Sequence, residues 1–251
     1  MSLKDDINKK VKEIMDNNFT VEKVSYIPDI ADTKLTFGNK GLKFEATVLN
    51  IDMRGSTSIL NKHNRSTVAK IHMAYFHTIV KIASKLGGHV RSFNGDSMLV
   101  FFPGTKKITL SNAVKTAMHL KYMLNDSSSG INKLLAKYSA IDFGIGLHDG
   151  EILCTKIGVG GESNNKGLFW AGNAVNMAVK LSDKAKSPDH ILISEFVYNN
   201  LTDEVKFDEK KDNWGNKYNH DIWNKVILDF EYNGTNQNYY KTSYHWPFTD
   251  L

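Results

Sequence analysis

Apolar residues recur at helical spacing in four stretches of the chain. Between residues 67 and 86 they fall at every third or fourth position, and Gly87-Gly88 follows, so this segment predicts an amphipathic helix with a glycine end. Similar stripes predict helices at 4–17, 110–124 and 171–185. Each predicted helix therefore has one face available for a core.

Strand patterns lie between these helices. Residues 44–51 are apolar on both faces, as in a central strand. Residues 90–93 and 98–102 flank Asn94-Gly95, a strong hairpin signal. Residues 141–147 alternate in polarity and predict a half-buried strand, and Asp149-Gly150 predicts a hairpin turn that lets 151–157 pair back. Late strands are expected at 226–230 and 239–244.

Hairpins mixed with helices, without regular strand–helix–strand alternation, favour an α+β fold with a mainly antiparallel sheet flanked by helices. We expect three parts. Residues 1–41 form an N-terminal helix and an irregular connector, and residues 42–207 form the core. Residues 208–251 form a C-terminal extension packed on the same domain.

Composition excludes some classes of protein. The chain is 41% hydrophobic and 24% charged, as in ordinary globular proteins. The net charge of +5 is spread along the sequence, so we expect no nucleic-acid partner. Its apolar runs are far shorter than the roughly 20 residues of a membrane span, and its N-terminus is too polar for a signal peptide. With Cys154 as the single cysteine, expected in the core, we expect a cytoplasmic protein without membrane contact.

Two aspartates lie where a cation and phosphates could bind. Asp52 follows the central strand and precedes residues 53–57, where a helix is expected to begin. A carboxylate there can hold a cation while the first amides of the helix take phosphate oxygens, although Asp52 could equally cap the helix. Asp96 ends the Asn94-Gly95 turn, where aspartate is also common for turn chemistry alone.

Asn176 and Lys180 stand four residues apart on the polar face of the helix predicted at 171–185. By itself this pattern is equally typical of a solvated helix surface.

In combination these segments are more specific. VLNIDMRGST at 48–57, Gly87-Gly88 followed by Asn94-Gly95-Asp96, and GNAVN at 172–176 occur in this order. Together they resemble the catalytic domain of the class III nucleotidyl cyclases, the adenylate and guanylate cyclases, over residues 42–200. The resemblance implies a ferredoxin-like α+β domain.

The resemblance also implies roles for individual residues. Asp52 and Asp96 would hold two Mn²⁺ or Mg²⁺ ions per site, and the ribose 3′ oxygen would attack the α-phosphorus and expel pyrophosphate. Asn176 would position the ribose. Lys180 stands where the family usually has an arginine that stabilises the transition state, and a lysine keeps the charge but loses the bidentate fork. The peptide groups expected to contact metal and triphosphate are those of Ile51, Met53, Arg54, Gly55, Ser56 and Thr57.

In this family each site combines the carboxylates of one chain with the Asn/Arg helix of another. The resemblance therefore implies a head-to-tail homodimer with two sites at its interface. The family also has a phosphate-binding lysine near the C-terminal end of the domain, for which Lys206 and Lys210 are candidates.

The positions that read the base differ from those of purine cyclases. Purine-specific members have a lysine four residues before the second metal aspartate, where this chain has Ser92 with Arg91 beside it. They have a polar or acidic residue seven before the asparagine, where this chain has Phe169. Phe169 could stack on a pyrimidine or lie in the core, and Arg91 or Asn50 could read the base edge.

The layout is similar to that of the stand-alone pyrimidine cyclases of bacterial anti-phage defence. This similarity implies that UTP or CTP is cyclised with manganese and that the cyclic nucleotide acts on a separate effector protein; we favour UTP. The alternatives are an adenylate cyclase with unusual base contacts and a degenerate, nucleotide-binding regulatory module. The retained Asp52 and Asp96 argue against the regulatory module. No sensor domain is recognisable, so the activating signal stays open.

Overall fold

The computed structural model describes residues 2–125, 130–158, 165–229 and 237–248. Within them, one sheet has the strand order β10-β11-β7-β5-β2-β4-β3, with β1 beside β2 and β6 beside β5. Its strands are β1 (Thr20–Lys23), β2 (Lys40–Arg54), β3 (His89–Asn94), β4 (Ser97–Pro103), β5 (Asp142–Gly158), β6 (Lys166–Ala171), β7 (Ile191–Ser194), β10 (Asn224–Ile227) and β11 (Asn238–Thr242). A separate hairpin consists of β8 (Phe207–Lys211) and β9 (Lys217–Asp221).

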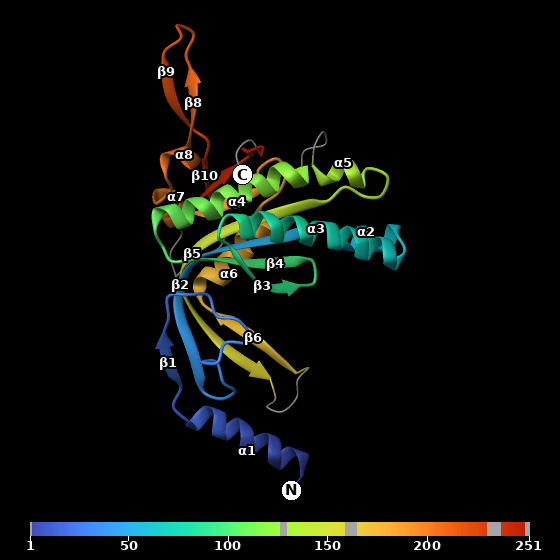
Figure 1. Ribbon diagram of the computed structural model, residues 1–251, viewed down its shortest axis with the longest axis vertical. Helices are drawn as coiled ribbons and strands as arrows, with labels where there is room; N and C mark the ends of the chain where they lie inside the picture. Colours follow the sequence, from blue (N-terminus) through green and yellow to red (C-terminus); the bar gives the residue numbers. More distant parts are fainter. Residues whose placement is uncertain (1, 126–129, 159–164, 230–236, 249–251) are drawn as a thin grey trace.

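Helices cover both faces of this sheet (Figure 1). The described helices are α1 (Leu3–Asp16), α2 (Ser56–Lys62), α3 (Arg65–Lys85), α4 (Lys107–Asn125), α5 (Ile131–Leu135), α6 (Asn173–Lys184), α7 (Glu195–Asn199) and α8 (Asp203–Lys206). Most of the described strand pairs are antiparallel, while β1–β2 and β5–β7 are parallel. The predicted α+β fold is therefore confirmed.

The alternation of β2 sends its side chains to two different layers. Leu49, Ile51 and Met53 are buried in the larger core, which α3 and α4 complete. The alternate positions face α6, and Asn50 donates a hydrogen bond to Ser182 of that helix. Asp52 lies on this second face by the same alternation. The last residues of β2 therefore place Ile51 and Met53 in the larger core and Asn50 and Asp52 on the opposite face.

The prediction of a turn at Asp149-Gly150 is wrong. β5 runs unbroken from Asp142 to Gly158 and pairs with β2 along most of that length. The prediction of a half-buried strand is also wrong, because residues 143–149 are all buried. The alternate positions that suggested solvent include Gly144 and Gly146, and these glycines instead let α6 lie directly on the strand.

Two regions for which no strand was predicted contain strands. The connector contains β1, which adds a strand beside β2. Residues 207–221 contain the β8–β9 hairpin, which projects away from the sheet (Figure 1). The predicted helix at 4–17 is present as α1, and none of its residues is buried. Cys154 is buried, as predicted. No helix among the described residues is long and apolar enough to cross a membrane.

Candidate active site

Asp52 lies near the end of β2, between the buried residues Ile51 and Met53. Burial raises the pKa of its carboxyl, the negative charge of Asp96 adds to the increase, and Arg54 partly opposes it. A partly buried carboxylate with a second negative charge nearby is a place where a cation is favoured. The charge of Asp183 on α6 acts on Asp52 in the same direction as that of Asp96.

Asp96 reaches this place through the β3–β4 hairpin. β4 pairs with β2 so that Ser97 lies opposite Asp52, and the Met53 amide donates to the carbonyl oxygen of Asp96 at 3.3 Å. Gly95, with φ of 63°, gives the turn the left-handed residue it needs. Two segments 44 residues apart (96 − 52) are thus fastened together by the ladder of the sheet.

The pair suits hard divalent cations, which prefer carboxylate, carbonyl and phosphate oxygens. Within the described ranges, no group of three or more histidine, cysteine, aspartate or glutamate side chains could hold a metal ion. Ions at Asp52 and Asp96 would therefore complete their coordination with backbone and substrate oxygens.

In the turn after β2, the first backbone amides of α2 donate no hydrogen bond to a capping side chain. Gly55 is the N-cap of α2 with a left-handed φ of 69°, and no side chain caps this helix start. Ser56 and Thr57 form its first turn. The predicted contacts of the peptide groups of residues 51–57 with a triphosphate stay a prediction.

The side chain of Arg54 points toward α6. Its guanidinium donates to the carbonyl oxygens of Ala185, Ser182 and Asp183 at the C-terminal end of the helix. The Arg54 side chain therefore binds α6, and only the peptide group of Arg54 stays a predicted contact of the triphosphate.

Asn176 and Lys180 are both exposed on α6. They share a polar stripe with Asn173 and Asp183, while Ala178 and Leu181 on the opposite side are buried. The end of α6 that lies by Asp52 is the C-terminal one, as the Arg54 contacts with residues 182–185 show. Asn176 is six residues from Ser182, about 9 Å along the helix axis.

The three residues predicted to contact the base lie on edge strands. Phe169 on β6 is 52% exposed, which contradicts the alternative that it lies in the core. Ser92 on β3 donates its hydroxyl proton to the side-chain oxygen of Asn94 at 3.0 Å. Arg91 donates to the carbonyl oxygens of Pro28 and Val90 and thereby holds the N-terminal connector against β3.

The hypothesis that Asn50 reads the base edge does not fit the structure. Asn50 is 2% exposed, and its amide nitrogen donates to the Ser182 hydroxyl inside the fold. The sequence could not show this, because the contact joins residues 132 positions apart.

The two candidates for the phosphate-binding lysine stay predictions, and the structure shows where each lies. The Lys206 ammonium lies over the Tyr198 ring, 4.1 Å from its centroid. Lys210 is on the projecting β8–β9 hairpin (Figure 1).

Tyr75 on α3 is a residue that the sequence reasoning missed. Its side chain is fully buried, and its hydroxyl has no hydrogen-bond partner among the described residues. Burial raises the pKa of this hydroxyl, and the charges of Asp52 and Asp96 add to the increase, so the ring lies within electrostatic reach of both carboxylates. A tyrosine among the isoleucines of the helix stripe was the available signal.

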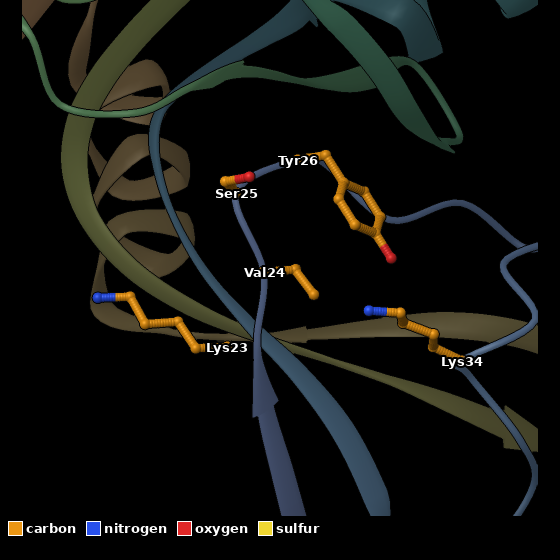
Figure 2. A pocket seen from close by; sticks show the side chains of 5 residues that line it. All are labelled: Lys23, Val24, Ser25, Tyr26 and Lys34. Carbon is orange, nitrogen blue, oxygen red and sulfur yellow. The ribbon is translucent and has the colours of Figure 1, made fainter.

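A shallow pocket lies elsewhere, where β1 meets the connector (Figure 2). It is lined by Lys23, Val24, Ser25, Tyr26 and Lys34. Lys34 pairs with Glu22 and Lys23 with Glu45, at 2.5 and 3.8 Å, so both ammonium groups already have carboxylate neighbours. None of these residues is among the predicted site residues.

Comparisons with known proteins agree with the fold. The family profile described as the adenylate and guanylate cyclase catalytic domain matches residues 41–216. A uridylate cyclase of Burkholderia cepacia is 30% identical over 230 residues, 89% of this chain and 96% of that protein. A uridylate cyclase of Xanthomonas perforans is 27% identical over 250 residues, 98% of this chain and 99% of that protein.

Among solved structures, the guanylyl cyclase Cya2 is similar with a TM-score of 0.64, at 19% identity over 84% of this chain and 98% of that chain. At this identity the likeness concerns the fold alone.

Proposed function

This chain belongs to the adenylate and guanylate cyclase catalytic domain family, the class III nucleotidyl cyclases, and from that premise we propose that it converts UTP into cyclic UMP and pyrophosphate. The observation that carries the chemistry is the proximity of Asp96 to the partly buried Asp52: burial raises the pKa of the Asp52 carboxyl, and the charge of Asp96 adds to the increase. The choice of a pyrimidine is supported by Ser92 and Phe169, and by the similarity to two proteins named uridylate cyclase.

In the proposed reaction Asp52 and Asp96 would hold the two divalent ions, Mn²⁺ or Mg²⁺. Such ions, when bound, reduce the negative charge of the phosphates and favour the deprotonated ribose 3′ oxygen. The 3′ oxygen forms a new bond to the α-phosphorus, and the bond from that phosphorus to the bridging oxygen of pyrophosphate breaks. The peptide groups of residues 51–57 orient the phosphates for this in-line displacement.

Asn176 and Lys180 complete the site from a second copy of the chain. Asn176 orients the ribose, and Lys180 places a positive charge near the phosphorus where negative charge develops. The exposure of both side chains, and the distance of Asn176 from the end of α6 beside Asp52, support a site shared between two chains. We therefore propose a homodimer with two such sites.

The base lies at Ser92 and Phe169 in this proposal. The half-exposed ring of Phe169 is available to stack on a pyrimidine, and the Ser92 hydroxyl can hydrogen-bond to its edge. A serine is too short to replace the lysine of the purine cyclases, so a purine would lack a partner at that position. Arg91 contributes by fixing β3 and the connector.

The resemblance to the pyrimidine cyclases of anti-phage defence supports a proposal about the biological role of the protein. We propose that the protein acts in the cytoplasm as a source of a second messenger for a separate effector protein. The same proposal keeps the cyclase domain at residues 42–207, between an N-terminal part at 1–41 and an extension at 208–251.

The purified protein is incubated separately with ATP, GTP, CTP and UTP in the presence of manganese, and the products are identified by chromatography and mass spectrometry. We expect cyclic UMP from UTP at the highest rate. Asp52→Ala, with an unchanged circular dichroism spectrum, is the control for contaminating activity.

Each other outcome has a definite meaning. Cyclic CMP as the main product would keep the pyrimidine site but change the substrate. A cyclic purine nucleotide as the main product would refute the pyrimidine proposal. No product from any of the four would favour a regulatory, nucleotide-binding module.

A further inference from the structure

Arg54 joins the strand that carries Asp52 to the helix that carries Asn176. Its Nε donates to the Ala185 carbonyl oxygen at 2.8 Å. One of its terminal nitrogens, Nη2, donates to the carbonyl oxygens of Ser182 at 2.8 Å and Asp183 at 2.5 Å. The last carbonyls of a helix have no partner within the helix, so the guanidinium satisfies three acceptors that would otherwise need water.

A second polar contact between β2 and α6 is made by Asn50, four residues before Arg54. The Asn50 side-chain nitrogen donates to the Ser182 hydroxyl at 2.6 Å, and that hydroxyl donates to the Val179 carbonyl oxygen at 2.7 Å. Asn50 and Ser182 are 2% and 1% exposed. A buried hydrogen bond of this kind has one well-defined geometry, because breaking it leaves polar groups unpaired.

The neighbouring strand leaves α6 almost no freedom to shift. A Cβ atom added at Gly144 would lie 2.1 Å from the Ser182 carbonyl oxygen, and one added at Gly146 would lie 2.1 Å from the Ala178 carbonyl oxygen. The backbone of α6 therefore lies directly on β5. With Arg54 and Asn50 holding its C-terminal half, the helix has its axial position fixed from the end of β2.

This contact has a consequence in a dimer whose sites are shared. Asp52 of a chain serves one site, and Asn176 and Lys180 of the same chain serve the other. Arg54 is two residues from Asp52, yet its side chain holds the helix that supplies the second site.

We propose that Arg54 is a positioning residue that couples the two sites, because it fixes the axial position of α6 and thereby the reach of Asn176 and Lys180 into the partner's site. The inference rests on the proposed function. It differs from the expectation that Arg54 acts on the triphosphate bound at its own Asp52. The three carbonyl contacts favour the positioning role, since a guanidinium that moved to phosphate would leave them without a donor.

Mixed dimers separate the two roles. A chain with Asp52→Ala and a chain with Asn176→Ala, carrying different affinity tags, are purified as a mixed dimer through both tags in turn. Such a dimer has one intact site, built from Asp52 of the Asn176→Ala chain and Asn176 of the Asp52→Ala chain. Arg54→Lys, which keeps the charge and loses the three-way contact, is then added to one chain or the other.

We expect Arg54→Lys on the Asp52→Ala chain, which supplies α6, to lower kcat about 10- to 100-fold with little change in KM, because a displacement near 1 Å can cost that much. On the Asn176→Ala chain, which supplies Asp52, the rate should stay within about threefold. Arg65→Lys, at an exposed arginine of α3, is the matched control and should change neither.

The opposite asymmetry, with the loss on the chain that supplies Asp52, would overturn the inference in favour of direct phosphate binding. Equal loss on both chains, or no loss on either, would also overturn it. Ser182→Ala removes the second contact without changing charge, and it should reproduce the same asymmetry at smaller size even if Arg54→Lys weakens folding. Absence of activity in the mixed dimer without any Arg54 change would refute the shared site itself, and the inference with it.

Discussion

The metal side and the base side of the proposed site lie on different parts of one sheet. Asp52 is on the central strand β2, with buried neighbours in sequence and paired strands on both sides. Phe169 is on β6, which is bonded to β5 alone among the described strands, and Ser92 is on the terminal strand β3. The proposed metal side is therefore fixed by the fold of a single chain, whereas the proposed base side lies on strands with one bonded neighbour among the described strands.

This difference indicates at which positions the substrate of such a domain can change. A change at Asp52 or Asp96 removes a charge that the paired strands hold near the end of β2, so we expect it to affect catalysis itself. A change at Phe169 or Ser92 alters a half-exposed or partly buried side chain on an edge strand, so we expect the substrate to change while the fold and the carboxylate pair persist. Substitutions on the two sides should therefore have different effects, the largest at the carboxylates.

Asp52→Ala and Asp96→Ala should each lower kcat by about a thousandfold or more, because the ions lose half of their protein carboxylates. The thermal transition should stay close to that of the unchanged protein, since removing one of two repelling carboxylates relieves strain at the site. Rates with manganese and melting curves provide the check. Asp203→Ala, at an exposed aspartate of α8, is the matched control. Persistent turnover in Asp52→Ala would refute the metal assignment.

Asn176→Ala should lower kcat by about a hundredfold through misplacement of the ribose. Lys180→Ala should lose activity to a similar extent, and Lys180→Arg should retain most of it or exceed the unchanged enzyme, because the arginine fork matches phosphate oxygens. Steady-state kinetics on the three variants test this. If Lys180→Arg were as inactive as Lys180→Ala, a role for the positive charge would be untenable.

Phe169→Ala should lower kcat/KM for UTP by about 5- to 150-fold, since stacking of a base on an aromatic ring contributes about 1–3 kcal/mol. The expected change is mainly in KM. Phe196→Ala removes a ring of similar exposure, 50% against 52%, from α7 and should have no effect. Equal losses for the two variants would show that the Phe169 effect is not specific to the base.

The smallest effect is expected at a position outside both sides of the site. Asp149 is 8% exposed, and burial raises the pKa of its carboxyl from 3.8 to about 6, against the hydrogen bond from the Thr47 hydroxyl. The unfolded chain loses this proton first, so the stability present below pH 3.8 declines as pH rises through about 6. Asp149→Asn should therefore stabilise the protein at pH 8 by at most about 3 kcal/mol.

Urea unfolding of Asp149→Asn and the unchanged protein at pH 5 and pH 8 measures this difference. The gain should be larger at pH 8, and activity should be unaltered. A larger gain at pH 5 would contradict the direction of the pKa shift.

Much of the fold follows from local patterns in the sequence. The apolar stripe at 67–86 predicted α3, which spans Arg65–Lys85, and Asn94-Gly95 predicted the β3–β4 hairpin that carries Asp96. The polar stripe of α6 predicted the exposure of Asn176 and Lys180. These features depend on neighbours within a few residues, which is why the sequence contains them.

Features that depend on distant partners were missed or misread. Asp149-Gly150 has the composition of a turn, yet β5 continues because its whole length pairs with β2. Gly144 and Gly146 were interpreted as a solvent face because nothing local shows that α6 lies on them. For Arg54 only a contact of its peptide group was predicted, and its side chain forms hydrogen bonds with residues 128–131 positions away, which no local pattern shows. Tertiary context overrides local preference in each case.

The most direct test of the central claim is a competition among the four triphosphates. Equal concentrations of ATP, GTP, CTP and UTP are mixed with manganese and the purified protein, and the initial rates of all cyclic products are measured together by mass spectrometry. The ratio of these rates is the ratio of the kcat/KM values. Cyclic UMP should exceed each cyclic purine nucleotide by at least about tenfold, and no product should form with Asp52→Ala. A cyclic purine nucleotide in excess of cyclic UMP would contradict the account.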